Sequence, residues 1–444
     1  MVLGMVKATN EGEEIAPTIP SYEDSVERTE TFYQKNELKN ILPANLLTVV
    51  NCFDEISHAH FDSIAISILC LLPCLCSGAK VSQEKGMQGR AIILYMLLLA
   101  PSGVGKTSVA MMGRHYLLNF LNQDDSPIDE NGKEDQLNNV KDLFVDGASA
   151  EGLESSFLSG SSPHLVMDEF GKYASTSRND VLKQNFLRML MQIYDSGTLV
   201  TRKLKDTKNT KLIVIKGMGL FAASTIGKSN LTPQDMRNMI SDGLLNRFLV
   251  IFGRYKRIPI RQELTLKQAE NVEAFARKFY DFAKEKHFYL GQEAYDVYVR
   301  FHNSINDTYY EKYKAEDDTA GLDIRLLTVS QRIAMLFQVC KNVEDNRPDQ
   351  VEIEAISMQR AIQLLDYLHK NHFDQILLYA NSKDGRPTTE DRVKSQIEKK
   401  TRLSIRNLTS NLSPLKTIHI TTAVEQLIKI GWAIQDEHGF ITKR

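Results

Sequence analysis

Residues Tyr95–Leu121 read YMLLLAPSGVGKTSVAMMGRHYLLNFL and carry the clearest pattern in the sequence. An apolar run, AIILYMLLLA, breaks into a short loop that contains two glycines and ends in Lys-Thr, and apolar residues then resume at helical spacing. An apolar run of about ten residues bounded by polar ones is typical of a strand buried on both faces. The stretch therefore predicts a buried strand, a tight loop and a helix in direct succession.

Three further stretches predict buried strands: KDLFVDG (residues 141–147), PHLVMDEF (163–170) and IVIKGMGLFAAST (213–225). Helical stretches separate them, and this alternation predicts an α/β fold with a parallel sheet. Outside this core, apolar residues recur at helical spacing before residue 90 and again after about residue 260, where strand signals fade. We therefore expect five regions: a flexible tail (1–36), an N-terminal helical region (37–90), an α/β core (91–260), a helical lid region (261–380) and a small C-terminal domain (381–444).

Charge and hydropathy exclude several classes of protein. The 444 residues carry a net charge of −2, so any nucleic-acid surface must be local. The first residues turn acidic and polar at once, so we expect no secretory signal. The most apolar segment, Ile64–Cys76, is too short for a membrane span and contains Pro73, which favours a buried helix. We expect a cytoplasmic protein with no membrane partner.

The loop after the first strand has the pattern of a phosphate-binding P-loop. Glycines at 103 and 105 allow backbone N–H groups to point at phosphate oxygens at the positive end of the following helix. Lys106 would reach the β- and γ-phosphates of ATP, and Thr107 would bind Mg²⁺. The first glycine of the pattern is replaced by Ala100, a turn position without direct phosphate contact. The predicted nucleotide-binding residues are Ala100, Pro101, Ser102, Gly103, Val104, Gly105, Lys106, Thr107 and Ser108.

Two later strand ends carry the side chains that hydrolysis needs. Asp168 follows a strand and can hold Mg²⁺, and the adjacent Glu169 can polarise the attacking water. An acidic strand end or a helix cap is the structural alternative. Ser224 and Thr225 end the last predicted core strand, and one of their hydroxyls would lie between these acids and the γ-phosphate, unless it only caps the strand. The sequence does not decide between the two hydroxyls.

Arginines downstream are candidates for contacts with phosphate. Arg247 lies after a short helix and before a strand, so it could enter the ATP site of a neighbouring subunit and stabilise transition-state charge. A surface arginine paired with an acid is the alternative. Arg325 and Arg332 are candidates for contacts from the lid region.

Two basic segments are candidates for DNA contacts. Alternating residues around DTKN predict a β-hairpin with a basic tip, which would follow a phosphate backbone or remain solvated. Residues 381–444 predict two short helices and a β-ribbon, the order of a winged helix, and residues 383–444 hold twelve Lys and Arg against seven Asp and Glu. A protein-binding winged helix is the alternative. The candidate DNA-binding residues are Arg202, Lys203, Lys205 and Lys208 in the hairpin, and Lys416, Thr417, His419, Lys443 and Arg444 in the C-terminal domain.

Taken together, these motifs resemble the P-loop ATPases of phages and mobile genetic elements, which are often fused to primases and are similar to AAA+ replicative helicases. The resemblance covers about three quarters of the chain and is carried by ILPANLL, LLLAPSGVGKTS, VDGASAEGL, HLVMDEFGKY, IYDSGTL, GLFAAST and DGLLNRFLV. It implies a homo-hexameric AAA+ ring that uses ATP and Mg²⁺ to translocate on single-stranded or forked DNA. No primase segment accompanies these motifs, so primer synthesis would be absent or supplied by a separate primase.

Two functions from different classes stay open. The first is an ATP-dependent DNA helicase or replication initiator of a mobile element or phage. The second is a nucleotide-switched DNA-binding regulatory or scaffold ATPase that hydrolyses slowly and unwinds nothing.

Overall fold

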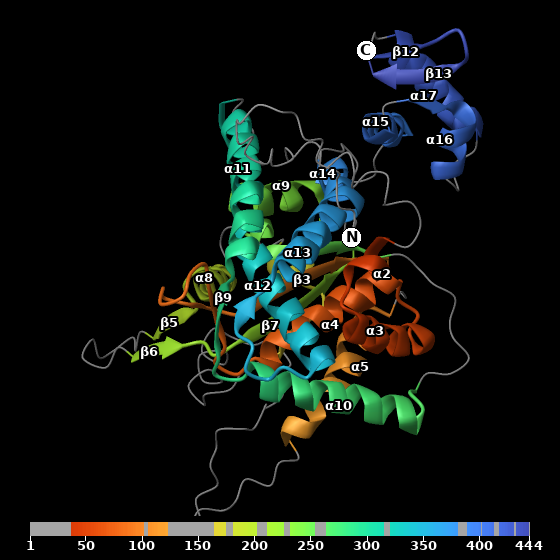
Figure 1. Cartoon of the computed structure of the whole chain (residues 1–444). Coiled ribbons are helices and arrows are strands. Elements are labelled where there is room, and N and C mark those ends of the chain that lie inside the picture. The colour runs from red at the N-terminus through yellow and green to blue at the C-terminus, as the bar shows by residue number, and fades with distance from the viewer. Residues whose placement is uncertain are drawn as a thin grey trace, which may run out of the picture. The chain divides into compact units, whose positions relative to one another are not determined.

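In the computed structural model, a parallel sheet lies among helices (Figure 1). The structure describes residues 37–101, 105–122, 164–174, 181–201, 211–225, 231–253, 263–314, 320–380, 389–400, 402–412, 417–429 and 432–443. The expected tail, the predicted strand at 141–147, and residues 102–104 of the loop lie outside these ranges.

The central sheet has four strands in the order β4-β7-β3-β8, and every neighbouring pair is parallel. Every residue of β3 and β7 is buried, because each of these strands has a neighbour on both sides and both faces of the sheet are covered. The predicted α/β class with a parallel sheet is thus confirmed. The strands are β3 (Ile93–Leu99), β4 (His164–Met167), β7 (Met218–Ser224) and β8 (Phe248–Phe252).

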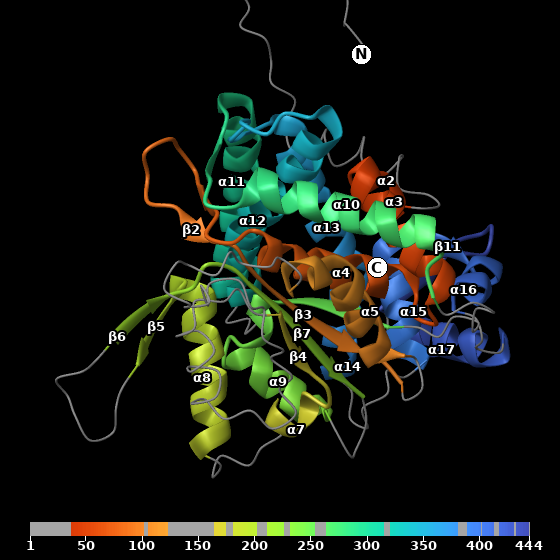
Figure 2. The same ribbon diagram turned by 90° about the horizontal axis from the view of Figure 1, so that it is seen from below.

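Helix α4 (Phe61–Leu75) is buried along its whole length, as expected for a buried helix in this segment. It packs directly on the backbone of β7, since a Cβ placed on Gly219 would lie 1.9 Å from the carbonyl oxygen of Cys70. Gly113 of α5 (Lys106–Leu118) likewise faces the Leu71 side chain. In Figure 2, α4 and α5 lie on one side of the sheet, and α8 (Val181–Ser196) and α9 (Pro233–Ser241) lie on the other.

The predicted β-hairpin is formed by β5 (Thr198–Thr201) and β6 (Lys211–Val214), an antiparallel pair that extends away from the central sheet in both views (Figures 1 and 2). Leu199 and Ile213 are buried on one face of the ribbon, whereas Leu212 and Val214 are 64% and 58% exposed. The basic tip, with Arg202, Lys203, Lys205 and Lys208, lies outside the described residues.

A second, mixed sheet corrects the expectation that the region after residue 260 is wholly helical. Its order is β10-β9-β1-β2, and β9 (His287–Leu290) pairs in parallel with both β1 (Lys80–Ser82) and β10 (Glu352–Ile353). Strand β2 (Arg90–Ala91) completes it. These strands have two to four residues each, too few to give a readable alternation, and their pairing joins segments about two hundred residues apart.

Long helices make up most of residues 263–380. Helices α11, α12 and α13 pack against one another, and a short π-helical segment, η4, continues α13 into α14. The bounds are α10 (Leu266–Ala283), α11 (Gln292–Lys314), α12 (Ala320–Asp345), α13 (Ala355–Leu368), η4 (His369–Phe373) and α14 (Asp374–Ala380). The remaining elements before residue 253 are α2 (Glu37–Ile41), α3 (Ala44–Ile56), α7 (Gly171–Ala174) and the short turns η1 (Asn119–Asn122) and η3 (Leu245–Arg247).

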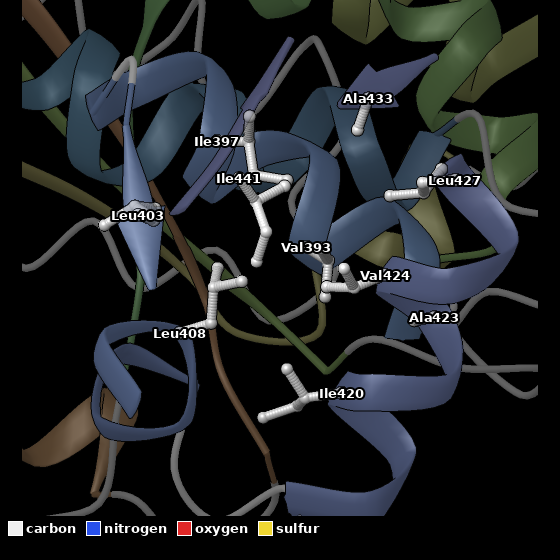
Figure 3. Packing of buried hydrophobic residues seen from close by; sticks show 10 residues of the cluster. All are labelled: Val393, Ile397, Leu403, Leu408, Ile420, Ala423, Val424, Leu427, Ala433 and Ile441. Atoms are coloured by element: carbon white, nitrogen blue, oxygen red, sulfur yellow. The ribbon is translucent and has the colours of Figure 1, made fainter. Parts of the chain in front are cut away.

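The C-terminal segment has its own apolar core, shown in Figure 3, to which helices and an antiparallel sheet of order β11-β13-β12 contribute. The predicted two helices and ribbon correspond to α16, α17 and β12–β13, but the segment also contains a third helix, α15, and a short strand, β11, which the sequence did not predict. The elements are α15 (Thr389–Lys400), β11 (Leu403–Ser404), α16 (Ile405–Asn411), α17 (Thr417–Lys429), β12 (Ala433–Gln435) and β13 (Phe440–Lys443). The core residues are Val393, Ile397, Leu403, Leu408, Ile420, Ala423, Val424, Leu427, Ala433 and Ile441.

Candidate functional site

The loop that follows β3 enters α5 through a left-handed glycine. Gly105 has φ +70°, and a Cβ there would lie 2.9 Å from Ser108 Oγ and 3.3 Å from the His58 ring. Only glycine adopts this conformation without strain and also fits this space. At the other end of the loop, Ala100 is buried and its amide donates to the Ser224 carbonyl. The loop is therefore anchored at both described ends, as its sequence pattern predicts for a tight turn.

The first turn of α5 meets the end of β4. Thr107 Oγ1 donates a hydrogen bond of 2.7 Å to Asp168 Oδ2, although the two residues are 61 positions apart in the chain. The other carboxylate oxygen of Asp168 accepts the Glu169 amide at 2.9 Å. The structure thus brings together the two residues that the sequence proposes as Mg²⁺ ligands.

Lys106 bends back over the loop. Its ammonium donates to the carbonyl oxygens of Ala100 at 3.3 Å and Pro101 at 3.2 Å. Burial lowers the pKa of Lys106, and the charges of Asp168 and Glu169 act in the opposite direction. The side chain is therefore a cation held at the mouth of the loop, next to two carboxylates.

Glu169 has an unusual backbone conformation for a residue with a side chain, with φ +54°. Such strain is concentrated at functional sites, where the surrounding structure maintains it. The neighbouring Phe170 amide donates to the Ala223 carbonyl, which ties this turn to β7. The Glu169 carboxylate is exposed and forms an ion pair with Lys172, so the proposed general base is paired in this conformation.

The two candidate hydroxyls at the end of β7 differ in their surroundings. Ser224 is fully buried, and its Oγ accepts the Gly171 amide and donates to the Thr225 carbonyl, both at 3.2 Å. These bonds fix the turn after β4 on the end of β7, which is the capping role that the sequence left open. Thr225 is half-buried and is the better candidate for a contact with phosphate.

Arg247 lies directly before β8, at the end of the sheet where the parallel strands begin. The loop lies at the other end, where the strands finish. It is 8% exposed, and it donates to both carboxylate oxygens of Asp195, from Nε at 3.2 Å and from Nη2 at 2.5 Å. Arg325 of α12 donates to the same carboxylate, with 2.7 Å between Nη1 and Oδ1. Within its own chain Arg247 is therefore paired with an acid.

Arg332 is a core residue and not a phosphate contact from the lid. Its guanidinium donates to the carbonyls of Ile93 at 3.0 Å and Tyr194 at 2.8 Å, and it is 2% exposed. Ile93 begins β3, whereas the loop follows the other end of that strand, so the expectation for this residue is wrong.

No pattern in the sequence predicts the buried polar cluster of Asp62, Tyr367 and His372. Asp62 of α4 accepts hydrogen bonds from the Tyr367 hydroxyl at 2.9 Å and from His372 Nε2 at 3.0 Å, and His372 Nδ1 accepts the Phe252 amide. Burial acts to raise the pKa of Asp62, but the hydrogen bonds from His372 and Tyr367 act in the opposite direction, and the pKa is lowered. Because Asp62 and His372 are 310 positions apart, only the fold brings them together.

The candidate DNA-binding residues of the C-terminal segment are described in part. Thr417 and His419 are exposed in the first turn of α17, beside the exposed Ile418. Lys443 is exposed, donates to Glu398 at 2.8 Å and lies over the Trp432 ring. Lys416 and Arg444 lie outside the described residues.

In the part of the chain that the structure describes, no helix combines the length and apolar character that crossing a bilayer requires. No protein-family model and no curated protein matches the sequence.

Proposed function

We propose that the chain is an ATPase whose catalytic site lies between the first turn of α5 and the end of β4. The observation that carries this proposal is the 2.7 Å hydrogen bond between Thr107 and Asp168 at the end of a glycine-containing loop. Hydroxyl and carboxylate oxygens are the hard ligands that Mg²⁺ prefers. Among the described residues, no three His, Cys, Asp or Glu side chains form a metal-binding group. An Mg²⁺ ion would therefore take these two ligands and complete its shell with phosphate oxygens and water.

The other predicted site residues would bind the phosphates and activate the attacking water. The backbone from Ala100 to Ser108 would hold the phosphates, with Lys106 turning from the loop carbonyls to the β- and γ-phosphates. Glu169 would polarise the attacking water, and Thr225 would contact the γ-phosphate. When bound, Mg²⁺ neutralises charge on the transferred phosphoryl group.

For the use of this energy, we propose an ATP-dependent DNA helicase or replication initiator of a mobile element or phage. The chain would form a homo-hexameric AAA+ ring in the cytoplasm, with the β5–β6 hairpin following DNA and residues 381–444 acting as a winged helix. The basic hairpin tip and the excess of cationic residues after residue 383 support a polyanionic partner. A separate primase would supply primers.

One contact favours the alternative of a slowly hydrolysing, nucleotide-switched regulator. Lys172 pairs with Glu169 and would withdraw the general base from water. Because the pair is exposed, its loss should raise basal turnover at most about fivefold in Lys172→Ala. A motor would release this pair when it binds DNA, whereas a regulator would keep it.

The experiment compares two substitutions at one position. Thr107→Ala removes the hydroxyl and should abolish Mg²⁺-dependent ATP hydrolysis, whereas Thr107→Ser keeps it and should retain most of the activity. Lys106→Ala and Glu169→Gln should lose both hydrolysis and unwinding of forked DNA. Equal turnover in Thr107→Ala and wild type would refute the proposed site, and hydrolysis without any unwinding would favour the regulator.

A further inference from the structure

Two hairpins lead into neighbouring strands of the central sheet. β1 and β2 form one of them, an antiparallel pair joined by residues 83–89, and β2 is followed directly by β3. β5 and β6 form the other, which is followed by β7. Since β3 and β7 are parallel and their first residues, Ile93 and Met218, lie opposite each other, both hairpins enter the same end of the sheet. In Figure 2, β2, β5 and β6 lie on the same side of the sheet.

The bases of the two hairpins are in contact. The Gly78 amide, just before β1, donates a hydrogen bond of 2.7 Å to the carbonyl of Lys216, just after β6. A Cβ placed on Gly197, directly before β5, would lie 3.2 Å from the Cβ of Ala91 in β2. A long ligand that follows the β5–β6 hairpin would therefore also meet the β1–β2 hairpin.

The β1–β2 hairpin has a tightly packed base and an open tip. At the base, a Cβ on Gly89 would lie 2.7 Å from both His287 Nε2 and Lys80 Cβ. At the tip, Gly86 has φ +88° with open space around it, and the Met87 side chain is 46% exposed. A fixed base thus presents the tip to solvent.

Three cations on this hairpin are not neutralised by acids. Lys80, Lys85 and Arg90 are exposed, and none of them forms an ion pair with a residue that the structure describes. Arg90 donates to the uncharged Thr328 hydroxyl at 3.0 Å. Glu84 is the only acid among residues 80–91. The hairpin therefore carries a net charge of +2 in a chain of net charge −2.

We propose that the β1–β2 hairpin is a second binding site for single-stranded DNA, next to the β5–β6 hairpin. Its three cations bind phosphates of the DNA backbone, and Met87 lies against the bases. The inference rests on the proposed DNA-translocating function, and it adds a contact that no sequence motif of the chain predicts.

The side chains around these cations favour single-stranded DNA as the ligand. Lys85 lies over the half-buried Tyr289 ring, so that an aromatic side chain accompanies the cations, and Met87 adds an apolar one. Cations combined with aromatic and apolar side chains are typical of sites for single strands. The one acid in the strands of this sheet, Glu352, is separated from the hairpin by β9. Continuity with the basic tip of the β5–β6 hairpin favours a long polyanion over an acidic patch on a protein.

The test measures how tightly the full chain binds a fluorescein-labelled oligothymidine, by anisotropy over a range of salt concentrations with a non-hydrolysable ATP analogue present. The triple variant Lys80→Gln, Lys85→Gln, Arg90→Gln loses three phosphate contacts. Its affinity should therefore fall about 100-fold at about 0.1 M salt, and its plot of log affinity against log salt should become shallower by about 2.

Two further triple variants separate charge from structure. Lys80→Arg, Lys85→Arg, Arg90→Lys keeps all three charges and should keep the wild-type salt dependence. Lys39→Gln, Lys267→Gln, Lys278→Gln removes as much charge from exposed positions of α2 and α10, and it should also bind like the wild type.

A crosslinking experiment tests the tip. Met87→Cys, labelled with a photoactivatable thiol reagent, should crosslink to the oligothymidine. Ile356→Cys in α13 is the matched control, because Ile356 is 40% exposed, and it should not exceed the background of the unsubstituted chain with its own five cysteines.

The outcomes separate the inference from the proposed function. A wild-type chain that binds no oligothymidine overturns the proposed DNA motor, and the inference with it. A wild type that binds, together with a glutamine variant of equal affinity and equal salt dependence, overturns the inference alone. An equal loss in the charge-preserving variant also overturns it, since the hairpin would then act through its structure and not its charge. Equal crosslinking of Met87→Cys and Ile356→Cys overturns the contact assigned to the tip.

Discussion

His164 is the first residue of β4, and both of its ring nitrogens are buried without a hydrogen-bond partner among the described residues. Burial, with a smaller contribution from the charge of Arg114, lowers the pKa of His164 to about 3. The folded chain therefore holds this imidazole neutral at pH values where the unfolded chain protonates it. At these pH values the His164 imidazole binds a proton only in the unfolded chain, and this binding stabilises the unfolded state relative to the folded one.

The burial of a neutral His164 should appear in the pH dependence of the free energy of unfolding. Between the unfolded pKa of about 6.5 and the folded value of about 3, the free energy of unfolding should fall with decreasing pH by up to about 1.4 kcal/mol per pH unit from this group. His164→Leu removes the group, so its urea midpoint should fall less steeply over the same range. Parallel pH profiles for the two proteins would contradict the assignment.

Residues of the site could be predicted from the sequence where the chemistry is local. The loop from Ala100 to Ser108 is one continuous motif between a strand and a helix, and Asp168 follows a recognisable strand. The distinction between Ser224 and Thr225 was out of reach, because it depends on a hydrogen bond to the Gly171 amide. Asp195 and the Asp62–His372 pair were missed since their partners are distant in sequence.

At the scale of elements, the contact between α4 and β7 leaves no room for a side chain. A Cβ on Gly219 would meet the Cys70 carbonyl oxygen, which the helix backbone cannot move aside. Gly219→Ala should therefore lower the free energy of unfolding by at least about 3 kcal/mol, measured by urea denaturation.

Gly113→Ala is the matched control for this contact. Its new methyl group would meet only the flexible Leu71 side chain, and the gain in helix propensity of about 1 kcal/mol offsets part of the cost. A Gly219→Ala protein as stable as Gly113→Ala would show that the helix does not lie on the strand this closely.

The β5–β6 hairpin gives a second prediction at this scale. Neutralising Lys203, Lys205 and Lys208 together to Gln should abolish unwinding and leave basal hydrolysis unchanged, because the tip would contact phosphates of DNA and not of ATP. The control changes Lys267, Lys278 and Lys284, three exposed lysines in and just after α10. Unwinding that survives the hairpin change would rule out its proposed contact with DNA.

Elements were predictable in proportion to their length and periodicity. The buried strands β3 and β7, helix α4 and the hairpin follow from apolar runs and alternation. The second sheet did not, because its four strands are very short and β9 pairs with β1 and β10 from distant parts of the chain.

At the scale of the whole molecule, turnover should depend on assembly. If a second copy completes the ATP site, as the proposed ring requires, ATP turnover per chain should rise with protein concentration until all chains are in rings. Turnover and sedimentation would be measured on the same samples, with Glu169→Gln as a control that assembles without hydrolysis. Constant turnover per chain across the dilution of rings into single chains would contradict a shared site.

The pairing of β1 with β9 also determines how long β1 must wait for its partner while the chain is being synthesised. Residues 80–82 leave the ribosome long before their partners at 287–289, and the outermost partner, β10, ends at residue 353. At about 5 to 20 residues per second, the edge of β1 waits roughly 10 to 40 seconds for β9, and roughly 15 to 50 seconds pass before β10 completes the sheet. During that interval the nascent chain exposes the edge of β1 that β2 does not cover. Holding chaperones should therefore matter more for its yield than for that of a protein built from neighbouring strands.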